Sequence, residues 1–190
     1  MQKKIRILFA ICSMGGGGAE RQVLGLLKHL DRTRFAPLLY LVYYAGELLP
    51  DIPEDVPVFT FDQRHPQLPR INWPGRMHGM RVRDMADVIR EQQIDIVYDR
   101  TYHMTLISGP ATKITGTKRI SVVVSDPQKD LIHYQTRFRR IKRRLLRKIY
   151  QSSHVVLTVP EGLREKMMKY YGLPDELVRT IYYPIDIDRI

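Results

Sequence analysis

The chain has 190 residues, 44% of them hydrophobic, which is enough to bury one substantial core in a single domain. No apolar run reaches membrane-spanning length, and Cys12 is the only cysteine, which excludes an internal disulfide and a cysteine-based metal site and favours a cytosolic protein. The formal net charge is +11, and residues 118–150 hold eleven Lys or Arg against two Asp. Charge this concentrated implies an anionic partner, such as a lipid surface, a nucleic acid or a phosphorylated substrate.

The first element is a short apolar run, residues 5–11, typical of a buried strand. Four glycines at 15–18 follow it, and a helical pattern runs from Ala19 to Leu30. Glycine permits a sharp turn and a close approach by another molecule. The helix start offers unpaired N–H groups and a partial positive charge, which suit a phosphate. The order strand, glycine loop, helix therefore predicts a binding loop.

Two known phosphate motifs are excluded in this loop. Glu20 stands where the dinucleotide fingerprint needs its third glycine, and no Gly-Lys-Ser or Gly-Lys-Thr follows as in a P-loop. Two alternatives stay open, a turn without a ligand and a signal peptide. The second is disfavoured because no small-residue cleavage site follows the apolar run.

The remaining elements alternate between strands and helices. This order predicts an α/β fold with an open, mainly parallel, Rossmann-like sheet of about seven strands and helices on both faces. Pro37 indicates an edge strand or the start of a strand, and Trp73 lies in an irregular loop at 62–75. The expected strands are 5–11, 35–44, 56–61, 94–98, 119–125, 154–159 and 178–183, and the expected helices are 19–30, 76–93, 105–114, 129–150 and 160–171.

Residues 14–31, MGGGGAERQVLGLLKHLD, resemble the opening of family 4 glycosyltransferases. That family shows Gly-Gly-x-Glu between its first strand and first helix, followed by an Arg and a Leu-rich helix. Gly17, Gly18, Ala19 and Glu20 match this motif.

The end of the chain, residues 154–190, is similar to the stretch that closes the N-terminal domain in that family. Glu161, Gly172, Pro174 and Asp186 fall at the family's positions. Two positions depart from the pattern, because Pro160 replaces the usual Ser and Tyr183-Pro184 replaces the usual Asn-Gly.

The resemblance implies half of a GT-B fold, in which two Rossmann-like domains enclose the active site. Residues 1–190 are then a single N-terminal, acceptor-side domain, and the C-terminal donor-binding domain is absent from this chain. It further implies a retaining glycosyltransferase of the hexosyltransferase type, with a nucleotide-sugar donor and a glycan or lipid-linked acceptor. No cofactor or metal is expected, and the isolated chain is expected to have little transferase activity.

The same resemblance suggests where the site residues lie. Gly16, Gly17, Gly18 and Glu20 are expected near the donor diphosphate or the acceptor, although Glu20 would also complement the dipole of its own helix.

Ligands of open α/β sheets bind beyond the carboxyl ends of the strands. Arg100, Tyr102, Ser125 and Asp126 follow two such ends and are expected to line the acceptor pocket. Ser125-Asp126 stands where some family members carry a histidine, so His103 is the candidate catalytic base, with an ordinary surface histidine as the alternative.

The basic stretch 136–150 places Phe138, Ile141, Leu145 and Ile149 at helical spacing among many arginines. A basic amphipathic helix suits an anionic bilayer, so the protein is expected to be cytoplasmic and peripheral to the inner membrane face. A solvated charged face is the alternative, and nucleic acid is an unlikely partner because aromatic residues are sparse among the charges. The expected membrane-facing residues are Arg139, Arg140, Arg143, Arg144 and Arg147.

Two other functions remain open from the sequence. The chain could be a stand-alone α/β module that binds a nucleotide or phosphate, or a nucleic-acid-associated protein that uses the basic helix.

Overall fold

The computed structural model of the protein describes residues 3–67, 75–129, 139–159 and 161–182. Strands and helices alternate along them, as the sequence pattern predicts. In chain order the elements are β1 (Ile5–Ile11), α1 (Gly18–His29), β2 (Phe35–Leu41), the 3₁₀ helix η1 (Leu49–Asp51), β3 (Val58–Thr60), α2 (Phe61–Arg64), α3 (Arg76–Glu91), β4 (Ile96–Arg100), α4 (Tyr102–Thr115), β5 (Lys118–Val123), α6 (Arg139–Gln151), β6 (Val155–Thr158), α7 (Glu161–Tyr171), the 3₁₀ helix η2 (Asp175–Leu177) and β7 (Val178–Thr180).

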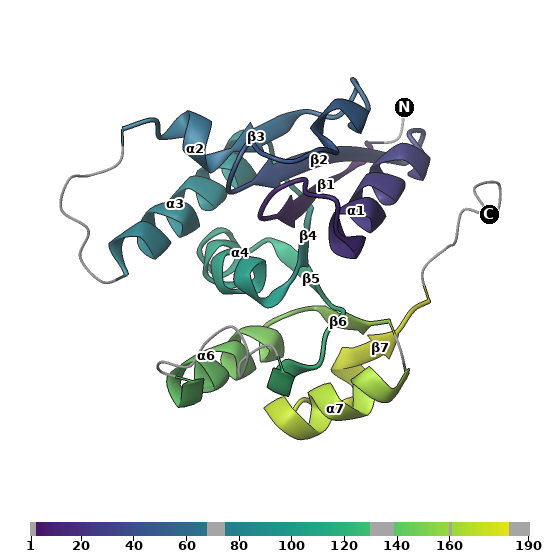
Figure 1. Cartoon of the computed structure of the whole chain (residues 1–190), viewed down its shortest axis with the longest axis vertical. Coiled ribbons are helices and arrows are strands. Elements are labelled where there is room, and N and C mark those ends of the chain that lie inside the picture. The colour runs from purple at the N-terminus through teal and green to yellow at the C-terminus, as the bar shows by residue number, and fades with distance from the viewer. Residues whose placement is uncertain (1–2, 68–74, 130–138, 160, 183–190) are drawn as a thin grey trace.

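The seven strands form one open sheet in the order β3-β2-β1-β4-β5-β6-β7 (Figure 1). Every neighbouring pair is parallel. The chain builds outward from β1 to β3, then crosses back and builds outward from β4 to β7. The predicted Rossmann-like sheet is confirmed, and its topological switch point lies between β1 and β4.

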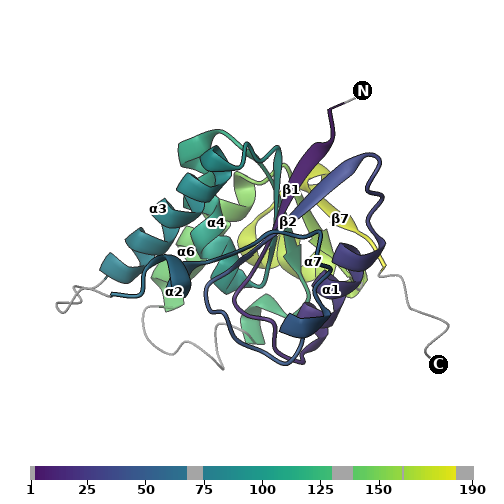
Figure 2. The same ribbon diagram turned by 90° about the horizontal axis from the view of Figure 1, so that it is seen from above.

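Alternating side chains of each strand divide the core into two layers. Leu8 and Ala10 of β1 pack with α3 and α4, whereas Phe9 and Ile11 pack with α1. Figure 2 shows α1 on one side of the sheet and α3, α4 and α6 on the other. A third cluster joins α6, α7 and the last strands. None of the helices that the structure describes is both long and apolar enough to cross a bilayer.

Pro37 lies at the beginning of β2, opposite Ile7 of β1. β2 has a strand on each side, but β3 pairs with it only from Leu39 onward. The missing N–H of Pro37 therefore falls where β2 has a single neighbour, so the start of a strand is the correct alternative.

Several element boundaries differ from the sequence expectation. Helix α4 begins at Tyr102, three residues early, and α2 occupies the first part of the expected loop at 62–75. β2 and β7 are shorter than predicted. Phe138, Trp73, Pro160 and the Tyr183-Pro184 pair lie outside the described residues.

Candidate functional site at the carboxyl edge of the sheet

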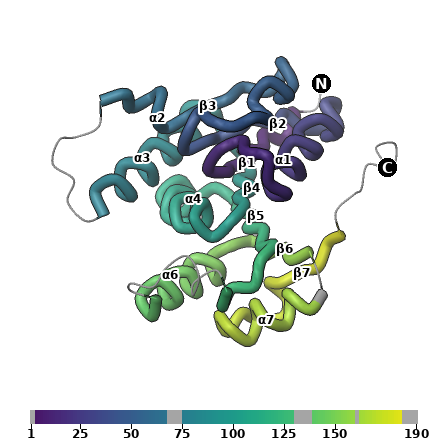
Figure 3. The backbone as a smooth tube through the Cα atoms, viewed as in Figure 1, coloured from purple at the N-terminus to yellow at the C-terminus, as the bar shows by residue number. Residues whose placement is uncertain are grey.

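The glycine loop, Gly15–Gly18, joins β1 to α1 at the carboxyl edge of the sheet (Figure 3). Backbone hydrogen bonds tie Met14, the residue before the loop, to a second loop: Met14 N donates to Ala45 O at 2.9 Å, and Leu48 N donates to Met14 O at 3.0 Å. On the other side, Arg21 Nε donates to Gly16 O at 2.9 Å. The loop is thus held from both ends rather than standing apart from the fold.

Two of the four glycines lie directly beneath glutamate carboxylates. A Cβ on Gly17 would lie 2.5 Å from Glu20 Oε2, and a Cβ on Gly16 would overlap the carboxylate of Glu47. Gly15 and Gly18 have open space around them. The carboxylate of Glu20 therefore folds back over Gly17, so the predicted loop residues lie together.

Strand β4 passes into α4 through Thr101, whose backbone has φ 71° and ψ 148°. This region is nearly restricted to glycine and costs about 1–3 kcal/mol for another residue. The turn is held by Thr105, whose backbone N and Oγ1 each contact Thr101 O at 3.1 Å. Strain of this kind directly after a strand end marks the turn as a candidate functional position.

The buried carboxylate of Asp99 holds this turn in place. It accepts hydrogen bonds from Thr105 Oγ1 at 2.7 Å and from Ser108 Oγ at 2.6 Å, which fixes the first turns of α4. Arg119 pairs with it at 3.3 Å and Ser121 Oγ donates at 2.9 Å, both from β5. Sequence reasoning missed this network, because no local pattern shows which charged strand residues point inward.

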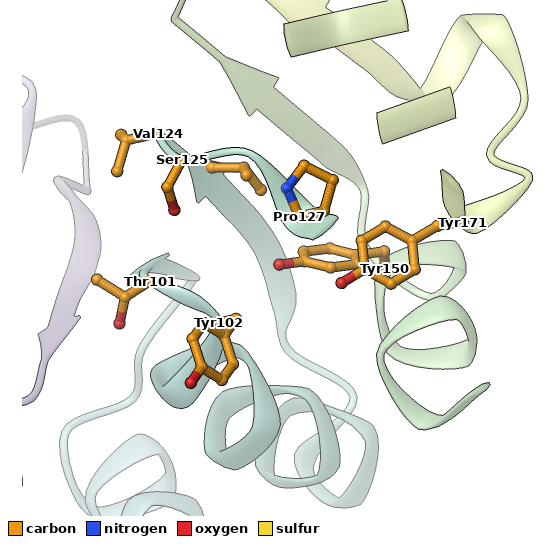
Figure 4. A pocket seen from close by; sticks show the side chains of 8 residues that line it. Thr101, Tyr102, Val124, Ser125, Pro127, Tyr150 and Tyr171 are labelled. Carbon is orange, nitrogen blue, oxygen red and sulfur yellow. The ribbon is translucent and has the colours of Figure 1, made fainter. Parts of the chain in front are cut away.

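Tyr102 and Ser125, two of the expected acceptor residues, meet in one small pocket (Figure 4). Thr101 lines it too, and Tyr150 and Tyr171 close it from α6 and α7. Its volume of about 10 Å³ has room for roughly one water molecule.

Asp126 lies beside this pocket, on a larger hollow of about 290 Å³ that also touches Val124 and Leu163. Lys166 Nζ donates to Asp126 Oδ2 at 2.9 Å. The Lys166 ammonium is the main reason that the pKa of Asp126 is lowered. The hollow combines an apolar wall with an ion pair at the carboxyl ends of β5 and β6.

The two remaining predicted residues lie elsewhere. Arg100 is only 1% exposed, and its guanidinium reaches under α1 to the amide of Gln22. His103 is exposed in the first turn of α4, with its ring 4.0 Å from that of Tyr102. Neither residue lines the pocket that Tyr102 and Ser125 share, although His103 lies against Tyr102.

A second group of side chains gathers at the switch point, and sequence reasoning missed it. Burial raises the pKa of the Cys12 thiol at the end of β1, although the nearby charge of Arg81 and a hydrogen bond with Thr101 act in the lowering direction. Tyr43, just beyond β2, accepts a hydrogen bond from Arg81 Nη2 at 2.7 Å. Cys12 and Tyr43 could have been found from their places after strand ends, but Arg81 lies within a helix and gave no signal.

Metal ligands do not cluster in the part of the chain that the structure describes: no three His, Cys, Asp or Glu side chains lie close enough together to hold an ion.

The basic helix α6 has two different apolar faces. Leu146, Ile149 and Tyr150 are buried against the core. Ile141 and Leu145 point outward and are 62% and 43% exposed. Ile149, which shares the helical spacing of Ile141 and Leu145, packs inward against Gly109 of α4.

The five arginines of α6 are not equivalent. Arg143 stacks over the Tyr170 ring at 4.3 Å and donates to the Tyr170 carbonyl oxygen at 2.6 Å. Arg147 lies against Gly172, where an added Cβ would be 3.2 Å from its Nη2. Both therefore contact α7 or the residue after it. Arg139, Arg140 and Arg144 are exposed without such a contact among the described residues.

Comparison with solved structures finds the same fold in proteins about twice as long. The chain matches an Anabaena Alr3699/HepE structure in complex with UDP at 22% identity and a TM-score of 0.70, covering 97% of this chain and 45% of that one. A glycosyltransferase from Rickettsia africae is matched at 18% identity and a TM-score of 0.67, covering 98% and 45%. The apo form of the lipopolysaccharide outer core galactosyltransferase WaaB is matched at 15% identity and a TM-score of 0.69, covering 96% and 47%.

The chain therefore spans less than half the length of these structures. Curated protein sequences gave no significant match. The family model named Glycosyltransferase Family 4 matches residues 16–189, from the glycine loop almost to the last residue. With the parallel sheet and the bonded glycine loop, this match shows that the chain belongs to glycosyltransferase family 4.

Proposed function

We propose that this chain is the acceptor-side half of a retaining glycosyltransferase that moves a hexose from a nucleotide-sugar donor to a glycan or lipid-linked acceptor. The observation that carries the proposal is the family match over residues 16–189, which includes the glycine loop at the carboxyl edge. Neighbouring structures contain UDP and UDP-glucose, which supports a nucleotide-sugar donor. Tyr102, Ser125 and Asp126 are the residues we assign to the acceptor side.

The chemistry requires stabilisation of the leaving diphosphate and orientation of the acceptor hydroxyl. The first turn of α1 supplies N–H groups at the glycine loop, which favour an anion. Glu20 and Arg21 flank that loop, and Arg21 supports it through Gly16 O. A metal or other cofactor is not part of this proposal.

The glycine loop offers a direct test of the transferase function. The assay uses a protein in which this chain is joined to its donor-binding half. Gly17→Val places a branched side chain against Glu20 and should lower transfer of labelled sugar, from a panel of nucleotide sugars to a membrane glycolipid extract, by at least about 100-fold. Gly25→Ala, inside the helix that follows the loop and with open space around the new Cβ, is the control. Equal activity of both variants, or no transfer from any nucleotide sugar by the wild-type protein that carries both halves, would contradict the proposal. The anomeric configuration of the product, read by NMR, tests retention.

We further propose that the protein works at the cytoplasmic face of a membrane and binds anionic lipid through the outward face of α6. That face combines Arg140, Arg144 and Lys148 with the exposed Ile141 and Leu145. Basic residues near an anionic bilayer contribute about 1 kcal/mol each, and apolar side chains add burial in the headgroup region.

Vesicle sedimentation tests this surface. Arg140→Glu/Arg144→Glu should weaken binding to phosphatidylserine-containing vesicles by roughly 30-fold or more, from about 1 kcal/mol for each basic residue lost. Lys4→Glu/Lys28→Glu makes the same change in net charge on exposed residues outside α6 and should bind nearly as wild type. If both variants lose binding equally, α6 is not the docking surface. Retention on nucleic acid with a steep salt dependence, without vesicle binding, would favour the nucleic-acid alternative.

A further inference from the structure

Arg81 stands on α3 at the carboxyl edge of the sheet, facing the residues that follow β1 and β2. Its guanidinium lies over the rings of Tyr43 at 5.4 Å and Phe61 at 5.6 Å. Its Nη2 donates to Tyr43 Oη at 2.7 Å. Two aromatic rings and one hydroxyl therefore fix the plane of this cation before any ligand arrives.

What Arg81 lacks is an anion. Two other packed arginines have one: Arg64 pairs with Asp84 at 2.8 Å, and Arg119 pairs with Asp99 at 3.3 Å. Arg81 forms no ion pair with a carboxylate of the described residues, and its Nε is buried without a hydrogen-bond partner. An unbonded buried donor costs about 1–3 kcal/mol, and more when the group is charged. Arg119 also has an unbonded Nε but has its carboxylate, so the missing anion is what sets Arg81 apart.

The surroundings place this cation beside the switch point. The charges of Arg81 and Glu20 both act on the thiol of Cys12 at the end of β1. Glu20 itself lies against Gly17 of the glycine loop. Tyr43 is 47% exposed, so the ring that supports the guanidinium also borders solvent. A ligand at the carboxyl edge can therefore approach Arg81 and the glycine loop together.

We propose that Arg81, oriented by Tyr43 and Phe61, binds an oxyanion carried by the acceptor, a phosphate or a carboxylate. The planar guanidinium matches such groups by paired N–H···O bonds, which a lysine cannot reproduce. This assignment rests on the proposed function, because it treats the carboxyl edge as the acceptor side. It adds a chemical feature of the acceptor, namely a negative charge near the sugar-accepting hydroxyl.

The test is a titration of the full chain with inorganic phosphate and, in a separate arm, with acetate, followed by NMR of the arginine Nε–H signals. In the wild-type protein, a saturable shift of the Arg81 signal is expected. For Arg81→Gln, phosphate binding is followed by the amide shifts at the end of β2 and should be at least 10-fold weaker. Arg83→Gln removes the same charge from an exposed residue of the same helix and should bind as wild type. Arg81→Lys keeps the charge without the fork and should bind with intermediate strength.

The two arms identify the ligand chemistry, since a shift with phosphate alone points to a phosphate-bearing acceptor and a shift with acetate points to a carboxylate. No saturable shift with either anion, or equal weakening by Arg81→Gln and Arg83→Gln, would overturn the proposal. Circular dichroism of each variant separates loss of binding from loss of folding. The titration needs no sugar donor. Phosphate binding at Arg81, together with no sugar transfer by a protein that also carries the donor-binding half, would refute the proposed function and leave this site standing.

Discussion

Gly46 supports the glycine loop from outside it. Its φ is +127°, and a Cβ there would overlap the backbone of Met14, directly before the loop. Both features demand glycine, because side chains rarely adopt that φ and the neighbouring backbone cannot rotate away. The loop that carries the family motif therefore depends on a residue that the motif does not include.

Gly46→Ala is expected to lower the free energy of unfolding by about 2–4 kcal/mol, from backbone strain and the clash with Met14. Urea denaturation followed by circular dichroism measures it. Gly25→Ala should instead stabilise the protein by about 0.5–1 kcal/mol, since Gly25 lies inside α1 with open space around it. A Gly46→Ala variant as stable as wild type would show that the loop accepts another path.

Cys12 should react slowly with alkylating reagents, because burial raises the pKa of its thiol and only the thiolate is nucleophilic. Modification by iodoacetamide at pH 8, followed by mass spectrometry, is expected to be at least about 10-fold slower in the folded protein than in urea. Equal rates in the two states would mean that the thiol is open to solvent and not raised in pKa.

At the scale of elements, the Asp99 network joins β4, β5 and α4. Both partners of its ion pair are almost completely buried. Arg119 also donates to Ser121 Oγ at 2.7 Å and to the carbonyl oxygen of Ile149 at the end of α6. One arginine thus connects the switch-point strand to the basic helix, so the position of α6 depends on a contact inside the sheet.

Arg119→Met should lower the free energy of unfolding by about 3–5 kcal/mol, because it leaves the Asp99 charge buried without its partner. The double variant Asp99→Asn/Arg119→Met removes both charges and should recover at least about 1 kcal/mol relative to the sum of the single effects. Denaturant titration of the four proteins in the cycle gives these values. Strict additivity would show that the two groups do not stabilise each other.

At the scale of the whole molecule, the net charge of +11 opposes the compact state and grows as carboxylates take up protons. The Arg32 guanidinium, 2.5 Å from Asp55, holds the pKa of that carboxyl below its usual value. Lys166 does the same for Asp126. Because the folded pKa lies below the unfolded one, each pair favours folding above about pH 4, and its contribution is lost as the pH falls through the folded pKa.

The free energy of unfolding should therefore be steady near neutral pH and fall between about pH 5 and pH 3. Urea titrations at each pH measure the slope. The double variant Asp55→Asn/Asp126→Asn should show a smaller fall in the free energy of unfolding, because it lacks the contribution of these two carboxylates. Added salt should reduce the remaining fall, which is due to repulsion among positive charges. A decline that is unchanged in the double variant would assign acid unfolding to other groups.

Much of the fold is predictable because its signals are local. Apolar runs such as residues 5–11 and 119–123 mark buried strands, and the four glycines mark the turn into α1, since strand burial and helix starts are set by neighbours in sequence. The early start of α4 was not predictable, because Thr101 adopts its unusual backbone only with Thr105 and Asp99 holding the turn.

By itself the sequence determined the parallel α/β class, the place of the glycine loop and the family resemblance, all of which depend on residues close together in the chain. Only the tertiary structure decided that Arg100 is buried under α1, that Arg143 faces α7, and that Arg81 meets Tyr43 beside Cys12. These contacts join residues from separate elements, and the strand order and the packing of helices on the sheet bring them together. Charge and residue type can be read from the sequence, but the fold sets which side chains are buried and which of them contact one another.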